Sequence, residues 1–342
     1  MKDKYLILAD GKSPHTLKWV KELYNYFELY LITLNGYNEQ LLSYIDKEKI
    51  YVLNEKVNSA GGNFRLLLKY FEIKKIVDTL RPKYVNAHYI SSYGILASLA
   101  KNSSFKLILS AWGTDILVTP FENIIKRKVA IFALSRADLV TSDSYFMSDK
   151  IKELVETSNV LTFPFGLDRV DLNSKYQKDK NLIFSNRALI KNYNIDKVLE
   201  WFSTLNSSMK LIIANYGDMR EELEEYVKRN NLSNRVEFVG FLSQNEQEEI
   251  YKKATYFISI PTSDSTAVSL LEAMSFGCVP IVSNLPANRE WVLDGCNGIF
   301  WSIDLNQLRV SEDASRINRE LISKKAIFKD SIELFVERLK EI

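Results

Sequence analysis

The C-terminal half contains a segment that combines two carboxylates with a small polar loop, residues 256–277 (YFISIPTSDSTAVSLLEAMSFG). An apolar run ends at Pro261, the loop follows, and a stretch with helical spacing carries Glu272. The free N–H groups at a helix start bind anions, and small residues let a phosphate approach the backbone. Glu272 follows Asp264 by about two helical turns and is placed to accept hydrogen bonds from sugar hydroxyls. An ordinary helix capped by Asp264 or Ser265 explains the same spacing equally well.

A second segment, residues 181–193 (NLIFSNRALIKNY), places basic side chains directly after an apolar run. Arg187 comes first and Lys191 follows one turn later. A guanidinium at the carboxyl end of a strand suits a diphosphate, because it holds two oxygens at once. Fixed cations also stabilise the charge that builds on a departing diphosphate. The alternative is an ordinary pair of basic surface residues.

The N-terminal half contains both histidines of the chain and one further acidic position. His88 lies just beyond the run 84–87, where it can act as a hydrogen-bond donor or a general acid or base. His15 follows the first apolar run through a short loop that contains Gly11, and Asp115 follows the turn at Gly113. A structural histidine, a helix-start residue and a local cap are the respective alternatives.

These residues follow short apolar runs that are continuous rather than alternating, as in strands buried on both faces of a parallel sheet. The predicted strands are residues 5–9, 29–34, 84–87, 105–111, 138–142, 181–185, 210–214, 235–240, 256–260 and 279–283. Helical spacing lies between them over 15–27, 64–80, 145–155, 218–230 and 265–276. This alternation predicts an α/β fold with helices on both faces of each sheet.

The alternation restarts after a polar, lysine-rich stretch, residues 167–180. We therefore expect an N-terminal Rossmann-like domain over 1–166, a linker over 167–180 and a second Rossmann-like domain over 181–311. Residues 312–342 are expected to form a helical tail that crosses back to the first domain. Doubly wound sheets bind ligands at the carboxyl ends of their strands, where the residues above lie.

Composition excludes several other classes. The 342 residues are 46% hydrophobic and 26% charged, with a net charge of +2, so nucleic acid is not an expected partner. Two cysteines without a CxxC pair and two histidines argue against a zinc site and a disulfide framework. The sequence has no Asp-x-Asp, GxGxxG, GxxxxGK[ST] or GxSxG motif. No apolar run is long enough for a signal peptide or a membrane span, and we expect a cytoplasmic protein.

Taken together, the motifs resemble the retaining GT-B glycosyltransferases of family GT4, over nearly the whole chain. The resemblance is carried by residues 257–300 (FISIPTSDSTAVSLLEAMSFGCVPIVSNLPANREWVLDGCNGIF), 186–202 and 231–259, and in the first half by 86–94, 109–117, 137–144 and 163–168. It implies two facing Rossmann-like domains, of which the first binds the acceptor and the second binds a nucleotide sugar.

The resemblance also implies residue roles. Catalytic positions would be His88 near the donor sugar, Arg187 at the diphosphate, Asp264 on the sugar hydroxyls and Glu272 on the ribose. The remaining donor-site residues would be Lys191, Val236, Leu242, Ser265, Thr266, Ala267 and Val268, with Val236 and the Gly240–Leu242 turn at the base. Gly11, His15 and Asp115 would contact the acceptor.

Three positions depart from the family pattern. Asp264 replaces a glutamate, which puts the identity of the donor sugar in doubt. Asn192 stands where the family has a lysine, so that Lys191 is the nearest substitute for the second cation. The glycine-rich acceptor loop is reduced to Gly11.

The implied activity is transfer of a hexosyl or N-acetylhexosaminyl group, with retention, from a UDP- or GDP-linked sugar. The acceptor would be a glycan, a lipid-linked molecule or a protein in bacterial polysaccharide or glycoconjugate biosynthesis, and no metal or other cofactor is expected. A sugar-nucleotide epimerase, a two-lobed sugar-binding protein and an inactive transferase-like subunit are the alternatives. Segment 121–136 (FENIIKRKVAIFALSR) suits either peripheral contact with the anionic cytoplasmic membrane face or a core helix with a solvated basic face.

Overall fold

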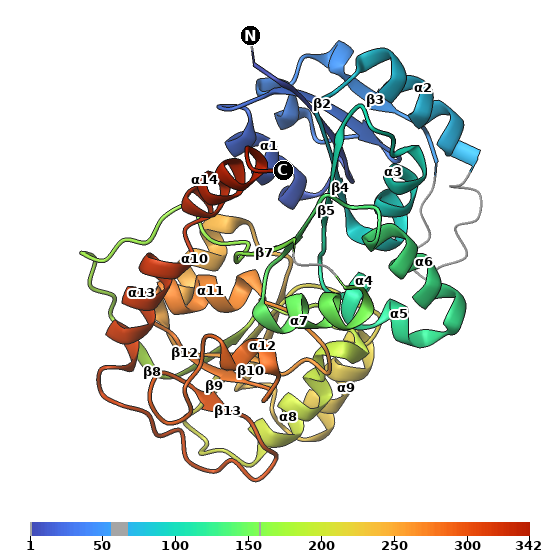
Figure 1. Cartoon of the computed structure of the whole chain (residues 1–342). Helices are drawn as coiled ribbons and strands as arrows, with labels where there is room; N and C mark the ends of the chain where they lie inside the picture. The colour runs from blue at the N-terminus through green and yellow to red at the C-terminus, as the bar shows by residue number, and fades with distance from the viewer. Residues whose placement is uncertain (1, 56–67, 157–158) are drawn as a thin grey trace. The chain divides into compact units, whose positions relative to one another are not determined.

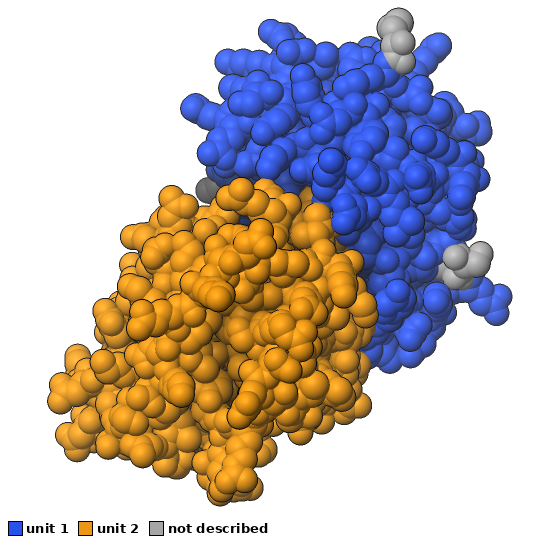
Figure 2. Space-filling view, turned by 90° about the vertical axis from the view of Figure 1, so that its left-hand side faces the viewer, with its two compact units in different colours: residues 1–163, 329–342 blue, residues 164–328 orange. Residues whose placement is uncertain are grey.

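The chain folds into two compact units in the computed structural model, which describes residues 2–55, 68–156 and 159–342. Unit 1 comprises residues 1–163 and 329–342, and unit 2 comprises residues 164–328 (Figure 2). The stretch predicted as a linker, 167–180, belongs to unit 2, and strand β8 already begins at Asp179. The sequence hides this start because the first residues of β8 are exposed and pair through the backbone, Asp179 with Ala254.

Unit 1 is built on a parallel sheet of seven strands in the order β3-β2-β1-β4-β5-β6-β7. Its strands are β1 (Lys4–Leu8), β2 (Glu28–Thr33), β3 (Ile50–Val52), β4 (Tyr84–His88), β5 (Lys106–Ser110), β6 (Leu139–Ser142) and β7 (Val160–Thr162). Successive side chains point to opposite faces, and both faces are covered. This confirms the parallel sheet that the continuous apolar runs predict.

The helices of unit 1 divide between the two faces of its sheet (Figure 1). Leu6 and Leu8 of β1 pack in the core that includes α2 (Tyr70–Leu80), α3 (Ile95–Ala100), α6 (Ile124–Leu134) and α7 (Tyr145–Leu154). On the other face, Tyr5 packs on Phe27, and α1 (Pro14–Leu23) meets α14 (Phe328–Leu339) where Trp19 contacts Phe335. Short helices α4 (Thr114–Leu117) and α5 (Thr119–Glu122) follow β5.

Unit 2 repeats this plan with six parallel strands in the order β10-β9-β8-β11-β12-β13. The strands are β8 (Asp179–Ser185), β9 (Lys210–Ala214), β10 (Val236–Gly240), β11 (Ala254–Ser259), β12 (Val279–Val282) and β13 (Ile299–Phe300). One face packs against α10 (Gln244–Lys253), α11 (Val268–Ser275) and α13 (Ala314–Lys325), and the other against α8 (Ile195–Ser203) and α9 (Arg220–Arg229). A short helix, α12 (Pro286–Arg289), precedes β13.

All ten predicted strands form, and the structure adds the short strands β3, β7 and β13. Helix α1 ends at Leu23 rather than at residue 27, since a turn follows. Helix α2 begins at Tyr70, and residues 64–67 of the predicted helix lie outside the described residues. The predicted tail divides, because α13 belongs to unit 2 and α14 from Lys329 onward belongs to unit 1. No helix in the described part of the chain is long and apolar enough to span a bilayer.

Each sheet has one point where its strand order reverses. In unit 1 the reversal lies between β1 and β4, and in unit 2 it lies between β8 and β11. In each sheet, the connections that leave the two strands at the reversal run to opposite faces of the sheet. This opens a crevice at the carboxyl ends of those strands, where α/β proteins bind ligands. His88 ends β4, while Arg187 and Asp264 follow β8 and β11.

Candidate functional site

Arg187 lies at the reversal point of unit 2 and is held from three directions. Its Nη2 lies 2.6 Å from Oδ2 of Asp264, and its Nη1 donates to Oγ of Ser269 at 2.8 Å. The guanidinium carbon lies 4.1 Å from the ring centroid of Tyr193, a cation–π distance. Nε of Arg187 is buried and has no hydrogen-bond partner among the described residues. The guanidinium is therefore fixed in place while keeping donor capacity.

Asp264 uses both carboxylate oxygens in the structure. Oδ2 pairs with Arg187, and Oδ1 accepts a hydrogen bond from the backbone N–H of Ser265 at 3.0 Å. Burial raises the pKa of the Asp264 carboxyl, and the positive charge of Arg187 acts against that rise. The predicted cation and the first predicted carboxylate thus contact each other directly.

Glu272 lies on helix α11, one turn after Ser269. The hydroxyl of Tyr251 lies 3.4 Å from Oε2 of Glu272 and 3.4 Å from the carbonyl oxygen of Ser269. Residues three apart on a helix are neighbours on its surface. Because Ser269 also accepts from Arg187, helix α11 brings Glu272 to the edge where Arg187 and Asp264 lie.

The loop between β11 and α11 is held by Asn192, at the position where the family has a lysine. Its Nδ2 donates to the carbonyl of Ser263 at 3.0 Å, and its Oδ1 accepts from the N–H of Ser263 at 3.2 Å. Its own carbonyl accepts from the N–H of Thr262 at 2.7 Å. Asn192 therefore positions the loop, whereas Lys191 is exposed on a short 3-10 turn.

The start of α11 differs from the sequence-based alternative of an Asp264 or Ser265 cap. The helix begins at Val268, with Ala267 as its N-cap in an extended conformation and no side-chain cap bond. Ser265, Thr266 and Ala267 are buried, and Thr266 accepts a hydrogen bond from Nε1 of Trp291 at 3.3 Å. The helix thus begins with backbone amides, the groups that bind anions at helix starts.

Two predicted base-site residues lie at opposite ends of β10. Leu242 follows the carboxyl end of the strand, and its carbonyl accepts from Nε2 of Gln247. Val236 is instead the first residue of β10, and its side chain is buried in the core with Leu223 and Val227 of α9. Gly240 lies four positions further along the strand, about 13 Å away. This placement contradicts the prediction that Val236 binds donor.

In unit 1, His88 is 2% exposed and lies between two tryptophans. Its ring centroid is 5.2 Å from that of Trp19 and 5.4 Å from that of Trp112. Neither ring nitrogen has a hydrogen-bond partner within the part of the chain that the structure describes. Burial, followed by the charge of His15, lowers the pKa of His88 to about 3. The ring is therefore neutral near pH 7 and offers one donor and one acceptor.

His15 and Gly11 lie in the loop and helix start that follow β1. The His15 ring packs edge-on against Trp112 at 5.0 Å, and burial lowers its pKa to about 4. Gly11 is buried, and a Cβ there would lie 2.7 Å from the carbonyl oxygen of Gly36. Gly11 is required by this close packing of two loops.

Asp115 does not project into a cleft as the sequence predicts. It is fully buried in α4, where Oδ2 accepts from the N–H of Ile90 at 2.8 Å and Oδ1 from the N–H of Trp112 at 3.0 Å. Burial raises its pKa to about 6, and these amide bonds oppose the rise. Asp115 ties the segments after β4 and β5 together, and this structural role corrects its assignment to the acceptor.

Sequence reasoning missed four residues that shape these two regions: Tyr193, Ser269, Trp19 and Trp112. Trp112 carried a usable signal, since it follows a predicted strand. Ser269 gave none, because its contact with Arg187 joins residues 82 positions apart. Tyr193 lies only six positions after Arg187, but no spacing rule shows that its ring packs on the guanidinium.

Two Rossmann-like units, each with polar residues at the carboxyl ends of its central strands, are the architecture of the GT-B class of glycosyltransferases. Comparison with known proteins agrees. A family model described as glycosyl transferase 4-like matches residues 4–144, and the model of glycosyl transferases group 1 matches residues 170–313. The chain belongs to these GT4-like glycosyltransferases of GT-B fold.

Individual relatives are distant. An uncharacterized glycosyltransferase of Methanocaldococcus jannaschii is 22% identical over 278 residues, 73% of this chain and 67% of the relative. The amylovoran biosynthesis glycosyltransferase AmsD of Erwinia amylovora is 22% identical over 331 residues, 90% of this chain and 91% of the relative. Three further curated relatives match over less than half of their own length. The crystal structure of HepE from Anabaena with UDP and glucose superposes with a TM-score of 0.75 at 17% identity, covering 99% of this chain and 100% of HepE.

Proposed function

We propose that this glycosyltransferase moves a hexosyl or N-acetylhexosaminyl group from a nucleoside-diphosphate sugar to an acceptor hydroxyl, with retention at the anomeric carbon. The observation that carries the proposal is the position of Arg187, fixed at the reversal point of unit 2 beside Asp264 and the start of α11. Complexes of HepE with UDP and with UDP-glucose make a uridine donor the first one to test.

The diphosphate is assigned to Arg187 and the first amides of α11. In the structure two of the guanidinium's N–H groups point at Asp264 and Ser269, and Nε keeps unused donor capacity among the described residues. Breaking the bond between the sugar and the diphosphate builds negative charge on the leaving group. A guanidinium and a helix start already in place stabilise that charge without reorganising.

The sugar hydroxyls are assigned to Asp264 and the ribose to Glu272. Both side chains are acceptors when ionised, which suits hydroxyl donors. In unit 1, the neutral ring of His88 is proposed to hydrogen-bond the sugar, because its buried nitrogens lack partners within the described residues. Hydrogen bonds from a ligand would remove the free-energy cost of burying these nitrogens without partners.

The reaction as proposed needs no metal ion, since Arg187 and α11 supply the positive field at the diphosphate. A chelator then leaves the rate unchanged, and a rate that collapses in EDTA and returns with Mg²⁺ contradicts this part of the proposal. The acceptors to test are a glycan, a lipid-linked molecule and a protein.

The proposal is tested by incubating the protein with UDP-, GDP- and ADP-linked sugars, with and without hydroxyl acceptors of the three classes. Release of nucleoside diphosphate together with a glycosylated product supports it, and the anomeric proton coupling of the product reports retention or inversion. An altered sugar in the donor-only reaction would identify an epimerase. Donor binding without turnover on any acceptor would favour an inactive subunit.

A further inference from the structure

Helices α5 and α6 of unit 1 present large apolar side chains to solvent. The face of α6 that packs on the unit is formed by Ala130, Ala133 and Leu134. Four large apolar side chains are exposed instead: Phe121 at 51%, Ile124 at 64%, Ile125 at 67% and Phe132 at 40%. This pattern contradicts a core helix whose exposed face is only basic.

Helix periodicity explains the arrangement. At 3.6 residues per turn, Ile124, Lys128 and Phe132 fall in one row along the helix, with Ile125 beside it. The smaller Ala130 and Ala133 fall on the opposite side and pack inward. The segment is apolar on both sides, which is why the sequence suggests a core helix.

The same surface is positively charged. Residues 121–136 contain four cations, Lys126, Arg127, Lys128 and Arg136, and one carboxylate, Glu122, a net charge of four minus one, or +3. Glu122 pairs with Lys126, and Arg127 lies 5.7 Å from the ring centroid of Phe121. Lys128 is exposed in the middle of the apolar row.

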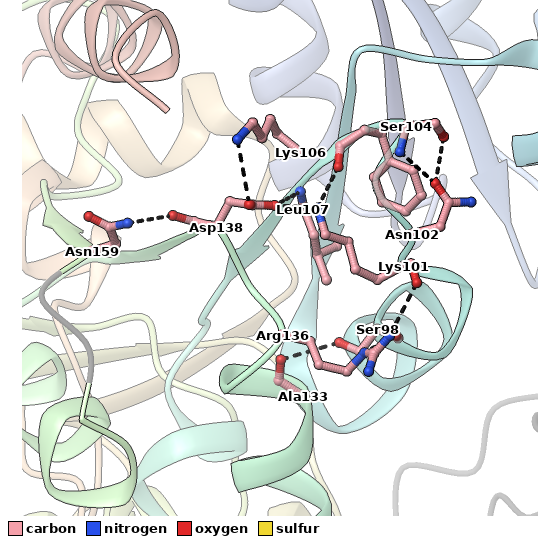
Figure 3. A network of polar contacts seen from close by, with 11 residues as sticks. Ser98, Lys101, Asn102, Ser104, Lys106, Leu107, Ala133, Arg136, Asp138 and Asn159 are labelled. Carbon is pink, nitrogen blue, oxygen red and sulfur yellow. Dashed lines mark hydrogen bonds and ion pairs between the residues drawn. The ribbon is translucent and has the colours of Figure 1, made fainter.

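The C-terminal end of α6 is anchored to α3, as Figure 3 shows. Nε of Arg136 donates to the carbonyl of Ser98 at 2.7 Å, and its Nη2 donates to the carbonyl of Lys101 at 3.1 Å. Oγ of Ser98 donates to the carbonyl of Ala133 at 3.3 Å. The exposed face of α6 is therefore presented by an element fixed to the body of unit 1.

We propose that this surface docks on an anionic lipid bilayer, and we name Phe121, Ile124, Ile125, Lys128 and Phe132 the α5–α6 patch. Aromatic and aliphatic side chains beside lysine and arginine are what an interfacial helix inserts into the headgroup boundary. Each cation near such a surface adds attraction to anionic headgroups. A second copy of the chain is a poorer occupant, because pairing segment 121–136 with itself brings together two segments that each carry a net charge of +3.

The docked surface adjoins the edge of unit 1 where His88 lies. Helix α4 leads directly into α5, and Asp115 of α4 binds the N–H of Ile90, which follows β4. A bilayer under the α5–α6 patch would therefore suit an acceptor held in the membrane. Docking goes beyond the proposed function and is measured without turnover.

The test is co-sedimentation of the full chain with vesicles of phosphatidylcholine alone and of phosphatidylcholine with phosphatidylglycerol. We expect binding only to the anionic vesicles at low salt, weakening as salt rises. Ile124→Ser with Ile125→Ser should lower the partition coefficient by roughly tenfold or more. Arg127→Gln with Lys128→Gln should lower it by roughly tenfold to thirtyfold.

Matched variants elsewhere control for general changes in polarity and charge. Leu293→Ser removes an apolar side chain that is 68% exposed in unit 2, and Lys324→Gln with Lys325→Gln removes two exposed cations of α13. Both should bind like the wild type. Because Ile124 and Ile125 are exposed, their replacement should leave the melting temperature unchanged.

Three outcomes would overturn the proposal. These are absence of wild-type binding to anionic vesicles, equal binding to neutral and anionic vesicles, and undiminished binding of the Ile124 and Ile125 double variant. Sedimentation velocity without lipid adds a further arm. A wild-type dimer that becomes a monomer in the Ile124 and Ile125 double variant would identify the patch as a contact between copies and would contradict membrane docking.

Discussion

The reversal points of the two units share a topology and differ in chemistry. In unit 2 the strands that flank the crevice lead to an arginine–aspartate pair, a serine hydroxyl and a helix start. In unit 1 the corresponding strands lead to neutral His88, which packs between Trp19 and Trp112, and His15 also packs against Trp112. Burial lowers the pKa of both histidines, whereas in unit 2 it raises that of Asp264 against the pull of Arg187.

This difference teaches that the strand order sets where a ligand can bind, and the residues after the strands set which ligand. A fixed guanidinium suits a doubly charged diphosphate. A cluster of aromatic rings and neutral imidazoles suits an uncharged, polyhydroxylated molecule. On the proposed function, the charged diphosphate belongs to unit 2, whereas the neutral residues of unit 1 suit uncharged hydroxyl groups.

Replacing Arg187 should have the largest effect. Arg187→Ala should reduce turnover with the preferred donor by about 10²–10³-fold, because the leaving diphosphate loses a preorganised cation. Stability should change far less. Arg229→Ala, which removes an exposed arginine of unit 2, should leave turnover unchanged. If Arg187→Ala turns over as fast as the wild type, Arg187 does not stabilise the leaving diphosphate.

The pH dependence of stability should reveal the neutral site of unit 1. The pKa of His88 is lowered in the folded chain, so the unfolded chain takes up a proton first as the pH falls below 6.5, and stability is lost on acidification. His88→Phe cannot titrate. Between pH 7 and pH 5, the wild type should lose about 2 kcal/mol more unfolding free energy than the variant. Urea unfolding at the two pH values measures this difference, and parallel losses would show that His88 is not held neutral.

Replacing Asn192 tests whether its hydrogen bonds to Ser263 position the loop before α11. Asn192→Ala removes two side-chain hydrogen bonds to Ser263 and should cost about 1–2 kcal/mol of unfolding free energy. It should also raise KM for the donor more than it lowers kcat. Asn230→Ala, at an exposed helix end of the same unit, provides the control. A donor KM equal to that of the wild type would show that the position of this loop does not affect donor binding.

Ser269 should give the smallest effect. Ser269→Ala removes one acceptor of Arg187 while leaving Asp264 in place. One hydrogen bond corresponds to about a twofold to tenfold loss of kcat/KM. Combining Ser269→Ala with Arg187→Ala should add almost nothing, because the serine acts through the arginine. Additive losses would give Ser269 a separate role.

Much of the fold could be predicted because the strands are buried on both faces and leave continuous apolar runs. The short strands β3, β7 and β13 escaped, since two or three residues leave no periodic signal. The start of β8 was missed for a related reason, because its exposed residues pair through the backbone.

The site was predictable only in part. Arg187 and Asp264 were found because each lies in the segment that follows a buried strand, but the contact between them joins residues 77 positions apart. Val236 and Asp115 were misplaced for different reasons. Val236 was assigned from the family pattern alone, although the predicted strand 235–240 already places it at the amino end, and no spacing rule shows that both oxygens of Asp115 bind backbone amides.

The most direct measurement is a crystal structure of the protein soaked with its preferred nucleotide sugar. The account predicts diphosphate oxygens within hydrogen-bond distance of Arg187 and of the first amides of α11, and ribose hydroxyls on Glu272. A donor bound with its diphosphate away from Arg187, or Arg187 and Glu272 turned toward different surfaces, would contradict it.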